Sequence, residues 1–377
     1  MNKQLRVGIV SRRFEYLGGI QTCIIELVTG LNELGIEPEI VWDEPMDWNA
    51  LQNPDLRASF GGGRFPVSSE RLRSLSPRVA RAADAINLRF ARLNLDRYDF
   101  VYCFVPGVRL PAGVPNVCWL TGPWHLRLPG DRVNWERWYD PRELRLAVNH
   151  LLWPLKKADK YSNYVTHSDW IADLFRDRYG FRPPVIWPPA RSRVLPTPPA
   201  EGRSGILWLS RLVPEKRVAS MLAVAKALPN QKITLAGAVA DESYLASLKE
   251  QIGSEGLNGI RIVENPREAE VASLLTSHDV FVFTAAWEHF GIVTVEAIQA
   301  GLLPIVHNTG GQKEIVPVES LRFLSDDELI DRVRSVVDMP QSERVKTIGD
   351  LQLHAERGFP KSYQEAMLSY LKPLLSA

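Results

Sequence analysis

The sequence predicts an α/β fold made of two doubly wound domains, in which helices cover both faces of a parallel sheet. Its 377 residues exceed the size at which one hydrophobic core usually stops growing. Short apolar runs alternate with stretches of helical periodicity, and this alternation passes through two successive cycles. Residues 182–203, which are rich in proline and arginine, separate the two cycles and are expected to form the linker.

These features predict the domain boundaries. We expect a first domain over residues 1–190 and a second over residues 191–359. The helical pattern at residues 360–377 follows both cycles and brings no strand of its own. We therefore expect this helix to pack on one of the two domains, for example back on the first.

Each cycle contains strands separated by helical stretches. The first opens with a strand at Leu5–Val10, a loop with Gly18 and Gly19, and a helix whose apolar residues recur at helical spacing from Ile20 to Leu34. Further strands of this cycle are predicted at residues 37–42, 100–105, 115–120 and 161–165. Those of the second cycle are predicted at residues 205–209, 232–236, 259–263, 280–284 and 303–307.

The composition argues against several classes of partner and site. Lysine and arginine number 45 against 44 acidic residues, so no net field favours nucleic acid. No apolar run approaches the roughly 20 residues that span a bilayer, and the first residues do not resemble a signal peptide, so we expect a cytoplasmic protein. Cys23, Cys103 and Cys118 lie among apolar neighbours without metal-ligand spacing, and we assign them no chemistry.

The most informative stretch is residues 287–296, where a strand ends and a helix begins near Gly291. It carries Glu288 and Glu296, eight positions apart. If the intervening residues are mainly helical, a rise of about 1.5 Å per residue separates the two carboxylates by about 12 Å, similar to the span of an extended nucleotide sugar from sugar to ribose. Backbone amides at a helix start favour anions such as a diphosphate. The candidate amides are those of Phe290, Gly291 and Ile292.

Several motifs together resemble the signature of the family 4 retaining glycosyltransferases of GT-B fold. They are the two glutamates with Phe-Gly between them, the stretch from Trp208 through Arg211 to Lys216, the turn at Gly310-Gly311, and Gly18-Gly19 after the first strand. The four matches occur in the family's order and cover nearly the whole chain. The resemblance implies two facing Rossmann-like domains with the active site in the interdomain cleft.

The resemblance also implies roles for individual residues. Arg211 and Lys216 would neutralise the donor diphosphate, Glu296 would accept hydrogen bonds from the ribose, and Glu288 would contact the transferred sugar. Gly18 and Gly19 would meet the phosphate from the first domain. No Asp-x-Asp pair is present, so we expect no metal ion. The nucleotide sugar would be a substrate, and we expect no cofactor.

One position departs from the family pattern. Many members place a histidine just after the strand that here ends at Leu120, but this sequence has Thr121, with His125 four residues later. Either Thr121 fills the role, or His125 reaches the site from its loop, or efficient transfer has been lost.

The resemblance predicts a retaining, metal-independent hexosyltransferase. It would move a mannose- or glucose-type sugar from a GDP- or UDP-sugar donor to a glycan or lipid-linked acceptor, in cell-surface polysaccharide or glycoconjugate biosynthesis. Two alternatives remain: a non-catalytic subunit that binds a nucleotide sugar or a glycan, and a nucleotide-sugar epimerase or hydrolase of the same fold.

An arginine-rich stretch between residues 64 and 97 has two interpretations. It is either a solvated helix face or a basic amphipathic surface that rests on anionic lipid and makes the protein peripheral to the membrane. The candidate lipid contacts are Arg71, Arg73, Arg78 and Arg81.

Overall fold

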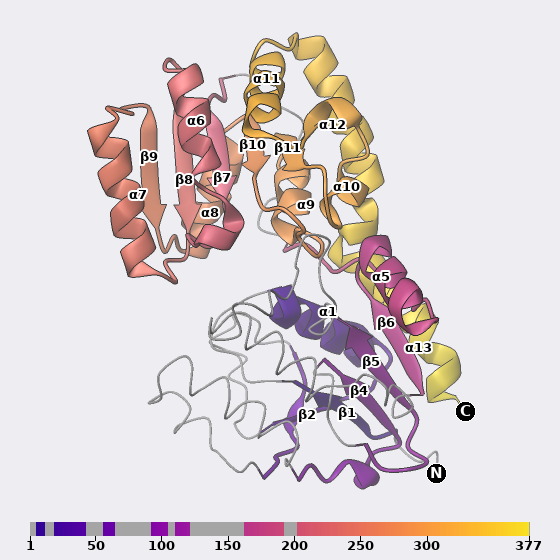
Figure 1. Ribbon diagram of the computed structural model, residues 1–377. Coiled ribbons are helices and arrows are strands. Elements are labelled where there is room, and N and C mark those ends of the chain that lie inside the picture. Colours follow the sequence, from indigo (N-terminus) through magenta and orange to yellow (C-terminus); the bar gives the residue numbers. More distant parts are fainter. Residues whose placement is uncertain are drawn as a thin grey trace. The chain divides into compact units, whose positions relative to one another are not determined.

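The computed structural model describes residues 5–11, 19–42, 56–64, 92–104, 110–120, 162–191 and 202–376. The chain divides into two compact units (Figure 1). Unit 1 takes the described residues up to His167, then Ile171–Trp187, and the chain from Tyr363 onward. Unit 2 takes Ser168–Trp170 and Pro188–Ser362.

Unit 1 is built on a six-stranded parallel sheet with the order β3-β2-β1-β4-β5-β6. The strands are β1 (Val7–Val10), β2 (Glu39–Val41), β3 (Ser59–Phe60), β4 (Phe100–Cys103), β5 (Asn116–Leu120) and β6 (Asn163–Thr166). The described helices of this unit are α1 (Gly19–Glu33), the short helix η1 (Leu95–Arg97), most of α5 (Asp169–Tyr179) and most of α13 (Pro360–Leu375). Strands β1, β4 and β5 are buried along their whole length, which matches their apolar sequences.

Helices α1 and α13 complete the core of unit 1. Helix α1 buries an apolar face that includes Ile24, Leu27 and Leu31, because these residues recur at helical spacing. Two residues of α13, Tyr363 and Met367, join the same hydrophobic cluster as α1 and the sheet and are fully buried. The segment after the second cycle of strands is therefore part of the core of unit 1.

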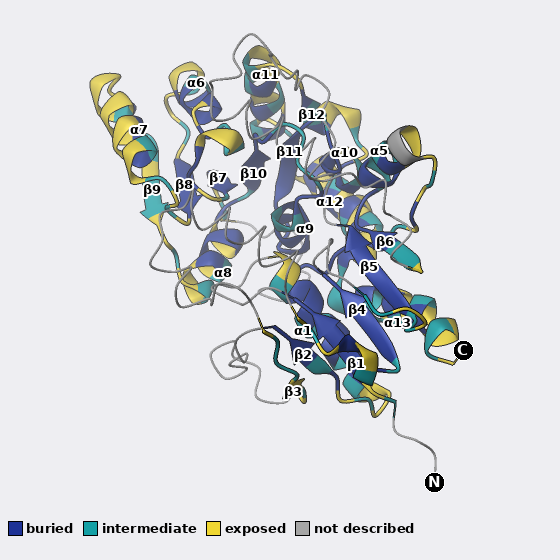
Figure 2. Cartoon of the chain, turned by 60° about the horizontal axis from the view of Figure 1, so that its bottom comes forward, coloured by how far each residue is buried: buried dark blue, intermediate teal, exposed yellow. Residues whose placement is uncertain are grey.

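Unit 2 is built on a second six-stranded parallel sheet, with the order β12-β11-β10-β7-β8-β9. The strands are β7 (Ile206–Leu209), β8 (Ile233–Gly237), β9 (Ile260–Glu264), β10 (Val280–Phe283), β11 (Leu303–His307) and β12 (Arg322–Phe323). The helices are α6 (Ser220–Ala227), α7 (Glu242–Ser254), α8 (Glu268–Ser277), α9 (Ile292–Gln299), α10 (Gln312–Ile315), α11 (Asp326–Val337) and α12 (Gln341–Ala355), with short helices η4 (Pro214–Lys216), η5 (Glu319–Leu321) and η6 (Glu356–Gly358). Figure 2 shows buried central strands and a largely exposed outer side on α7.

The observed sheets confirm the predicted fold class of two Rossmann-like, doubly wound units. Read from β9, the second sheet repeats the order of the first: the third strand of each cycle lies at one edge, followed by the second, first, fourth, fifth and sixth. The ten predicted strands are all present, and most begin one or two residues later than expected. The two strands that the pattern missed, β3 and β12, have two residues each and lie at sheet edges, so they are too short to show an alternation.

Other expectations concern the linker, the cysteines and the membrane. Within the predicted linker, Val185 forms an isolated parallel bridge with Thr166 at the edge of the first sheet. Cys23, Cys103 and Cys118 are buried free thiols. Among the residues that the structure describes, no helix has the length and apolar character needed to cross a membrane.

Candidate functional site

The candidate site lies at the carboxyl ends of β7 and β10. The strand order of unit 2 reverses between these two neighbours, and ligands of doubly wound sheets bind in the crevice at such a reversal. The loop after β7 carries Arg211 and Lys216, and the loop after β10 carries Glu288. Two cations and a carboxylate therefore belong to the loops at this reversal of the strand order.

Lys216 and Glu288 form a partly buried ion pair. The ammonium Nζ of Lys216 donates to Oε2 of Glu288, and their side chains are 16% and 20% exposed. Burial raises the pKa of the Glu288 carboxyl, but the charge and hydrogen bond of Lys216 more than offset this effect and hold the pKa below its ordinary value. The Lys216 ammonium also lies 5.5 Å from the ring centroid of Phe283. Glu288 is therefore ionised at neutral pH and ready to accept hydrogen bonds.

Thr284 fixes the backbone of Lys216 to the sheet. Its hydroxyl donates to the carbonyl oxygen of Lys216 at 2.7 Å and accepts from the indole Nε1 of Trp208 at 2.9 Å. Trp208 lies fully buried on β7, and Thr284 directly follows β10. The position of Lys216 is thus set by two central strands rather than by its own loop alone. Arg211, earlier in the same loop, has an exposed side chain.

The loop around Glu288 is in close contact with the turn at Gly310-Gly311. The Gly311 N–H donates to the Glu288 carbonyl at 2.8 Å. A Cβ atom at Gly310 would lie 2.3 Å from the Glu288 carbonyl oxygen, and one at Gly311 would lie 2.3 Å from that of His289. Only glycine allows this approach, so the Gly310-Gly311 pair supports the backbone that presents Glu288.

Helix α9 starts at Ile292, one residue after its N-cap Gly291, which has a φ of 100°. The predicted separation of about 12 Å between the two carboxylates assumed that the residues between them are mainly helical. That assumption holds only from Ile292 onward. Glu296 is 5% exposed, and its carboxylate accepts a hydrogen bond from the Arg191 N–H at 3.4 Å. Phe290, just before the helix, is buried as well.

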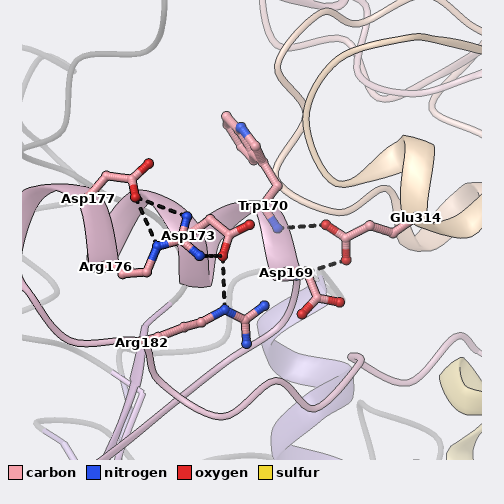
Figure 3. A network of polar contacts seen from close by, with 7 residues as sticks. All are labelled: Asp169, Trp170, Asp173, Arg176, Asp177, Arg182 and Glu314. Carbon is pink, nitrogen blue, oxygen red and sulfur yellow. Dashed lines mark hydrogen bonds and ion pairs between the residues drawn. The ribbon is translucent and has the colours of Figure 1, made fainter.

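Glu314, in the short helix α10 that follows the Gly310-Gly311 turn, caps the start of α5. Its two carboxylate oxygens accept hydrogen bonds from the Asp169 and Trp170 N–H groups at 2.8 and 2.7 Å, as Figure 3 shows. Burial raises the pKa of the Glu314 carboxyl, and these two bonds offset the effect only in part. The Trp170 ring is stacked near that of Trp287, with centroids 6.3 Å apart. Both carboxylate oxygens of Glu314 are thus bonded to the first N–H groups of α5.

The structure describes all the predicted site residues of unit 2 but only one of those in the first half of the chain. Arg211, Lys216, Glu288, Phe290, Gly291, Ile292 and Glu296 all lie in the loops after β7 and β10 or in α9. Gly19 is the first residue of α1 and is exposed. The other predicted site residues, Gly18, Thr121, His125, Arg71, Arg73, Arg78 and Arg81, lie outside the described residues.

Sequence reasoning missed three polar residues that support the site. These are Thr284, Thr309 and His307. Each lies within two residues of the carboxyl end of a strand, so a search for polar residues at strand ends could have found them.

Comparisons with known proteins agree with the motifs. Residues 196–348 match the family described as Glycosyl transferases group 1, and residues 17–192 match the one described as Glycosyltransferase Family 4. The candidate site lies within the first match, and the strands of the first sheet from β2 onward lie within the second.

Two curated relatives are mannosyltransferases by name. One is GDP-Man:Man(3)GlcNAc(2)-PP-Dol alpha-1,2-mannosyltransferase of Dictyostelium discoideum, 23% identical over 55% of this chain and 45% of its own. The other is GDP-mannose:cellobiosyl-diphosphopolyprenol alpha-mannosyltransferase of Xanthomonas oryzae pv. oryzae, 27% identical over 38% of this chain and 34% of its own. This chain therefore spans less than half the length of each of these two relatives.

A solved structure extends the similarity to the whole fold. The structure of HepE from Anabaena, determined in complex with UDP and glucose, matches with a TM-score of 0.68 and 19% identity. The match covers 98% of this chain and 99% of that one. At this identity the likeness concerns the fold, which is that of the GT-B glycosyltransferases.

Proposed function

We propose that this chain, which belongs to the glycosyl transferases of group 1, transfers a mannose- or glucose-type hexose from a nucleotide-sugar donor to a glycan or lipid-linked acceptor. The observation that carries the proposal is the ion pair of Lys216 with Glu288 where the strand order of unit 2 reverses. This pair brings together a cation suited to phosphate and a carboxylate suited to sugar hydroxyl groups.

The donor diphosphate would bind to Lys216, Arg211 and the first amides of α9. As the glycosidic bond to phosphate breaks, negative charge grows on the departing nucleoside diphosphate, and fixed cations stabilise it without having to reorganise. Thr284 supports this role because it ties the Lys216 backbone to β7 and β10. The helix start adds the partial positive charge of unpaired N–H groups. In this proposal the two side chains do the work that a divalent metal does in other sugar transferases.

The two glutamates would bind the two ends of the donor. Glu296, buried one turn into α9, accepts hydrogen bonds from the ribose hydroxyl groups. Glu288, kept ionised by Lys216, accepts from a hydroxyl of the transferred sugar. We propose that the anomeric configuration is retained. The acceptor would attack the face from which the diphosphate leaves, and the leaving phosphate oxygen would take up the acceptor's proton.

A lipid-linked acceptor is the favoured class. The two mannosyltransferases named above have lipid diphosphates, dolichol or polyprenol, in the names of their acceptors. The arginine-rich sequence with Arg71, Arg73, Arg78 and Arg81 suits an anionic cytoplasmic membrane surface. The enzyme would then act as a peripheral protein in cell-surface polysaccharide or glycoconjugate biosynthesis.

Vesicle sedimentation tests the membrane part of this proposal. The intact protein should sediment with phosphatidylglycerol vesicles and not with phosphatidylcholine vesicles, and replacement of the four arginines by glutamine should abolish the difference. Equal behaviour of the intact protein with both lipids would remove the membrane from the proposal.

A thermal-shift screen against UDP, GDP, ADP and their common sugar conjugates, with and without EDTA, tests the donor part. A ligand at a hundred times its Kd stabilises the folded state by about 2.7 kcal/mol, a clearly measurable rise in Tm. An EDTA-resistant shift with one nucleotide supports the metal-free clamp, whereas a shift lost in EDTA contradicts it. Donor turnover without an acceptor would favour a hydrolase or epimerase, and binding without turnover on lipid-linked and glycan acceptors would favour a non-catalytic subunit.

A further inference from the structure

A strained residue immediately precedes Glu288. The backbone of Trp287 has a φ of 56°, in the left-handed region that bulky side chains rarely adopt. Such a conformation persists only where its surroundings hold it, and it is often found at functional sites. The peptide that links Trp287 to Glu288 therefore depends on contacts that fix it.

The side chain of Thr309 provides one of these contacts. Its hydroxyl oxygen accepts a hydrogen bond from the Trp287 N–H at 2.8 Å. Thr309 lies in the turn after β11 and directly precedes Gly310, whose lack of a side chain admits the backbone of Glu288. One short turn thus holds both sides of the strained residue.

His307 fixes the orientation of the Thr309 hydroxyl. Its Nδ1 atom lies 2.8 Å from the Thr309 oxygen, and the Thr309 N–H donates to the His307 carbonyl at 2.8 Å. The ring packs edge-on against Phe323 with centroids 5.2 Å apart, and the residue is only 5% exposed. Burial, and then the nearby charge of Arg217, lower the pKa of His307 to about 4, so the imidazole is neutral at pH 7. A neutral Nδ1 can accept the hydroxyl proton, which leaves an oxygen lone pair for Trp287.

The backbone of Lys216 and the helix that carries Glu296 have anchors outside this turn. Lys216 is held through Thr284 and Trp208, and Glu296 lies within α9. Only Glu288 follows directly from the residue that Thr309 holds. A change at Thr309 should therefore act on the sugar end of the donor and spare the nucleotide end.

We propose that Thr309 is a positioning residue that acts through Trp287 to hold Glu288 against the transferred sugar, and so distinguishes the nucleotide sugar from the free nucleotide. This inference rests on the proposed function. A purely structural role for the hydroxyl would instead weaken both ligands equally, through a general loss of order in unit 2.

Calorimetric binding of UDP, UDP-glucose, GDP and GDP-mannose to the full chain tests the proposal. Thr309→Val keeps the shape of the side chain but removes the hydroxyl acceptor. Thr309→Ala also removes the acceptor, and its small side chain serves as a second test in case the valine variant folds poorly. Loss of one buried hydrogen bond predicts about tenfold weaker binding of the sugar conjugate, with the parent nucleoside diphosphate within twofold of wild type. Thr309→Ser should restore both affinities, and Thr276→Val, at an exposed residue of α8 bonded only to its own helix, should change neither.

The outcomes separate this inference from the proposed function. Equal weakening of nucleotide and nucleotide sugar, or no weakening in either variant, would overturn the role of Thr309 while leaving donor binding intact. If the wild-type protein binds none of the four probes, the proposed function is overturned, and this inference with it.

Discussion

The two units have the same strand order but differ in the residue that directly follows the fourth strand of each sheet. In unit 2 this residue is Thr284, whose hydroxyl donates to the Lys216 carbonyl at the candidate site. In unit 1 it is Phe104, which is buried in the hydrophobic core. A doubly wound sheet therefore provides a place for a ligand, whereas the residues at its strand ends decide which chemistry occurs there.

The units also differ in how their cores are completed. The core of unit 1 includes Tyr363 and Met367 from α13, far along the chain from its strands. The sheet of unit 2 and its helices come from one continuous stretch that starts at Pro188, apart from Ser168–Trp170. Substitutions in α13 should thus act on stability, and substitutions in the loops after β7 and β10 on ligand binding and transfer.

The largest effect is expected from removal of the Lys216 charge. Lys216→Ala should lower sugar transfer roughly thousandfold, about 4 kcal/mol in the barrier, because the cation stabilises charge that develops during bond cleavage. Nucleoside diphosphate binding should weaken much less. Steady-state transfer and calorimetric binding measure the two effects. Lys226→Ala, at an exposed lysine paired with Glu255, is the matched control, and transfer within threefold of wild type in Lys216→Ala would remove the clamp from the site.

A core substitution in α13 should destabilise unit 1 without affecting the donor. Met367 is fully buried and accepts a hydrogen bond from the Tyr102 hydroxyl, with oxygen and sulfur 3.6 Å apart. Met367→Ala should lower the free energy of unfolding by about 3 kcal/mol, which urea titration measures. Leu353→Ala, at a leucine that is 69% exposed on α12, should change it by less than about 0.5 kcal/mol. Weaker nucleotide binding in Met367→Ala would show that α13 affects ligand binding as well as stability.

The buried histidine of unit 2 predicts a dependence of stability on pH. The pKa of His307 is about 4 in the folded chain, below the ordinary 6.5, so the unfolded chain binds more protons between these values. The stability that the neutral His307 contributes is present above pH 6.5 and is lost as the pH falls toward 4. At pH 5 this loss lowers the free energy of unfolding by about 2 kcal/mol.

Urea unfolding of wild type and His307→Asn at several pH values checks this expectation. The loss of unfolding free energy between pH 7 and pH 5 should be about 2 kcal/mol smaller in the variant. Between pH 7.5 and 8.5 the free energies of unfolding of the two proteins should change with pH by the same amount. An identical loss in both proteins on acidification would contradict the assignment to His307.

The smallest effect is expected at the ribose end of the donor. Glu296→Ala should weaken nucleotide binding about tenfold, or roughly 1.4 kcal/mol, because two hydroxyl groups lose their hydrogen-bond acceptor. The nucleotide affinity of Glu296→Gln, which keeps one carbonyl oxygen, should lie between those of Glu296→Ala and wild type. Calorimetry with the nucleotide found in the thermal-shift screen measures both, and unchanged affinity in the alanine variant would place the ribose elsewhere.

The strands of unit 2 could be predicted from the sequence for a physical reason, whereas the roles of its motif residues rest on the family resemblance. Buried parallel strands need continuous apolar runs, such as those of β10 and β11, and charged residues that follow such runs stand out. The short edge strands β3 and β12 have no such run, and they were missed.

The contacts that support the site could not be predicted from the sequence. Thr309 lies 22 residues from Trp287, and Thr284 lies 68 residues from Lys216, so their hydrogen bonds depend on how strands far apart in sequence become neighbours. The strain at Trp287 is also invisible in the sequence, because nothing in a tryptophan predicts a positive φ. The bonds of Glu314 to the start of α5, 145 and 144 residues away, could not be predicted either.

The dependence of unit 1 on α13 has a consequence for biosynthesis. On the ribosome, the strands of unit 1 emerge first, but Tyr363 and Met367 follow only after the whole of unit 2 has been made. At about 5–20 residues per second, synthesis from Trp187 to Tyr363 takes roughly 10 to 35 seconds. During that interval the nascent unit 1 exposes the apolar surface that α13 later covers, whereas most of unit 2 can fold as it emerges. The unit translated first is thus the one completed last.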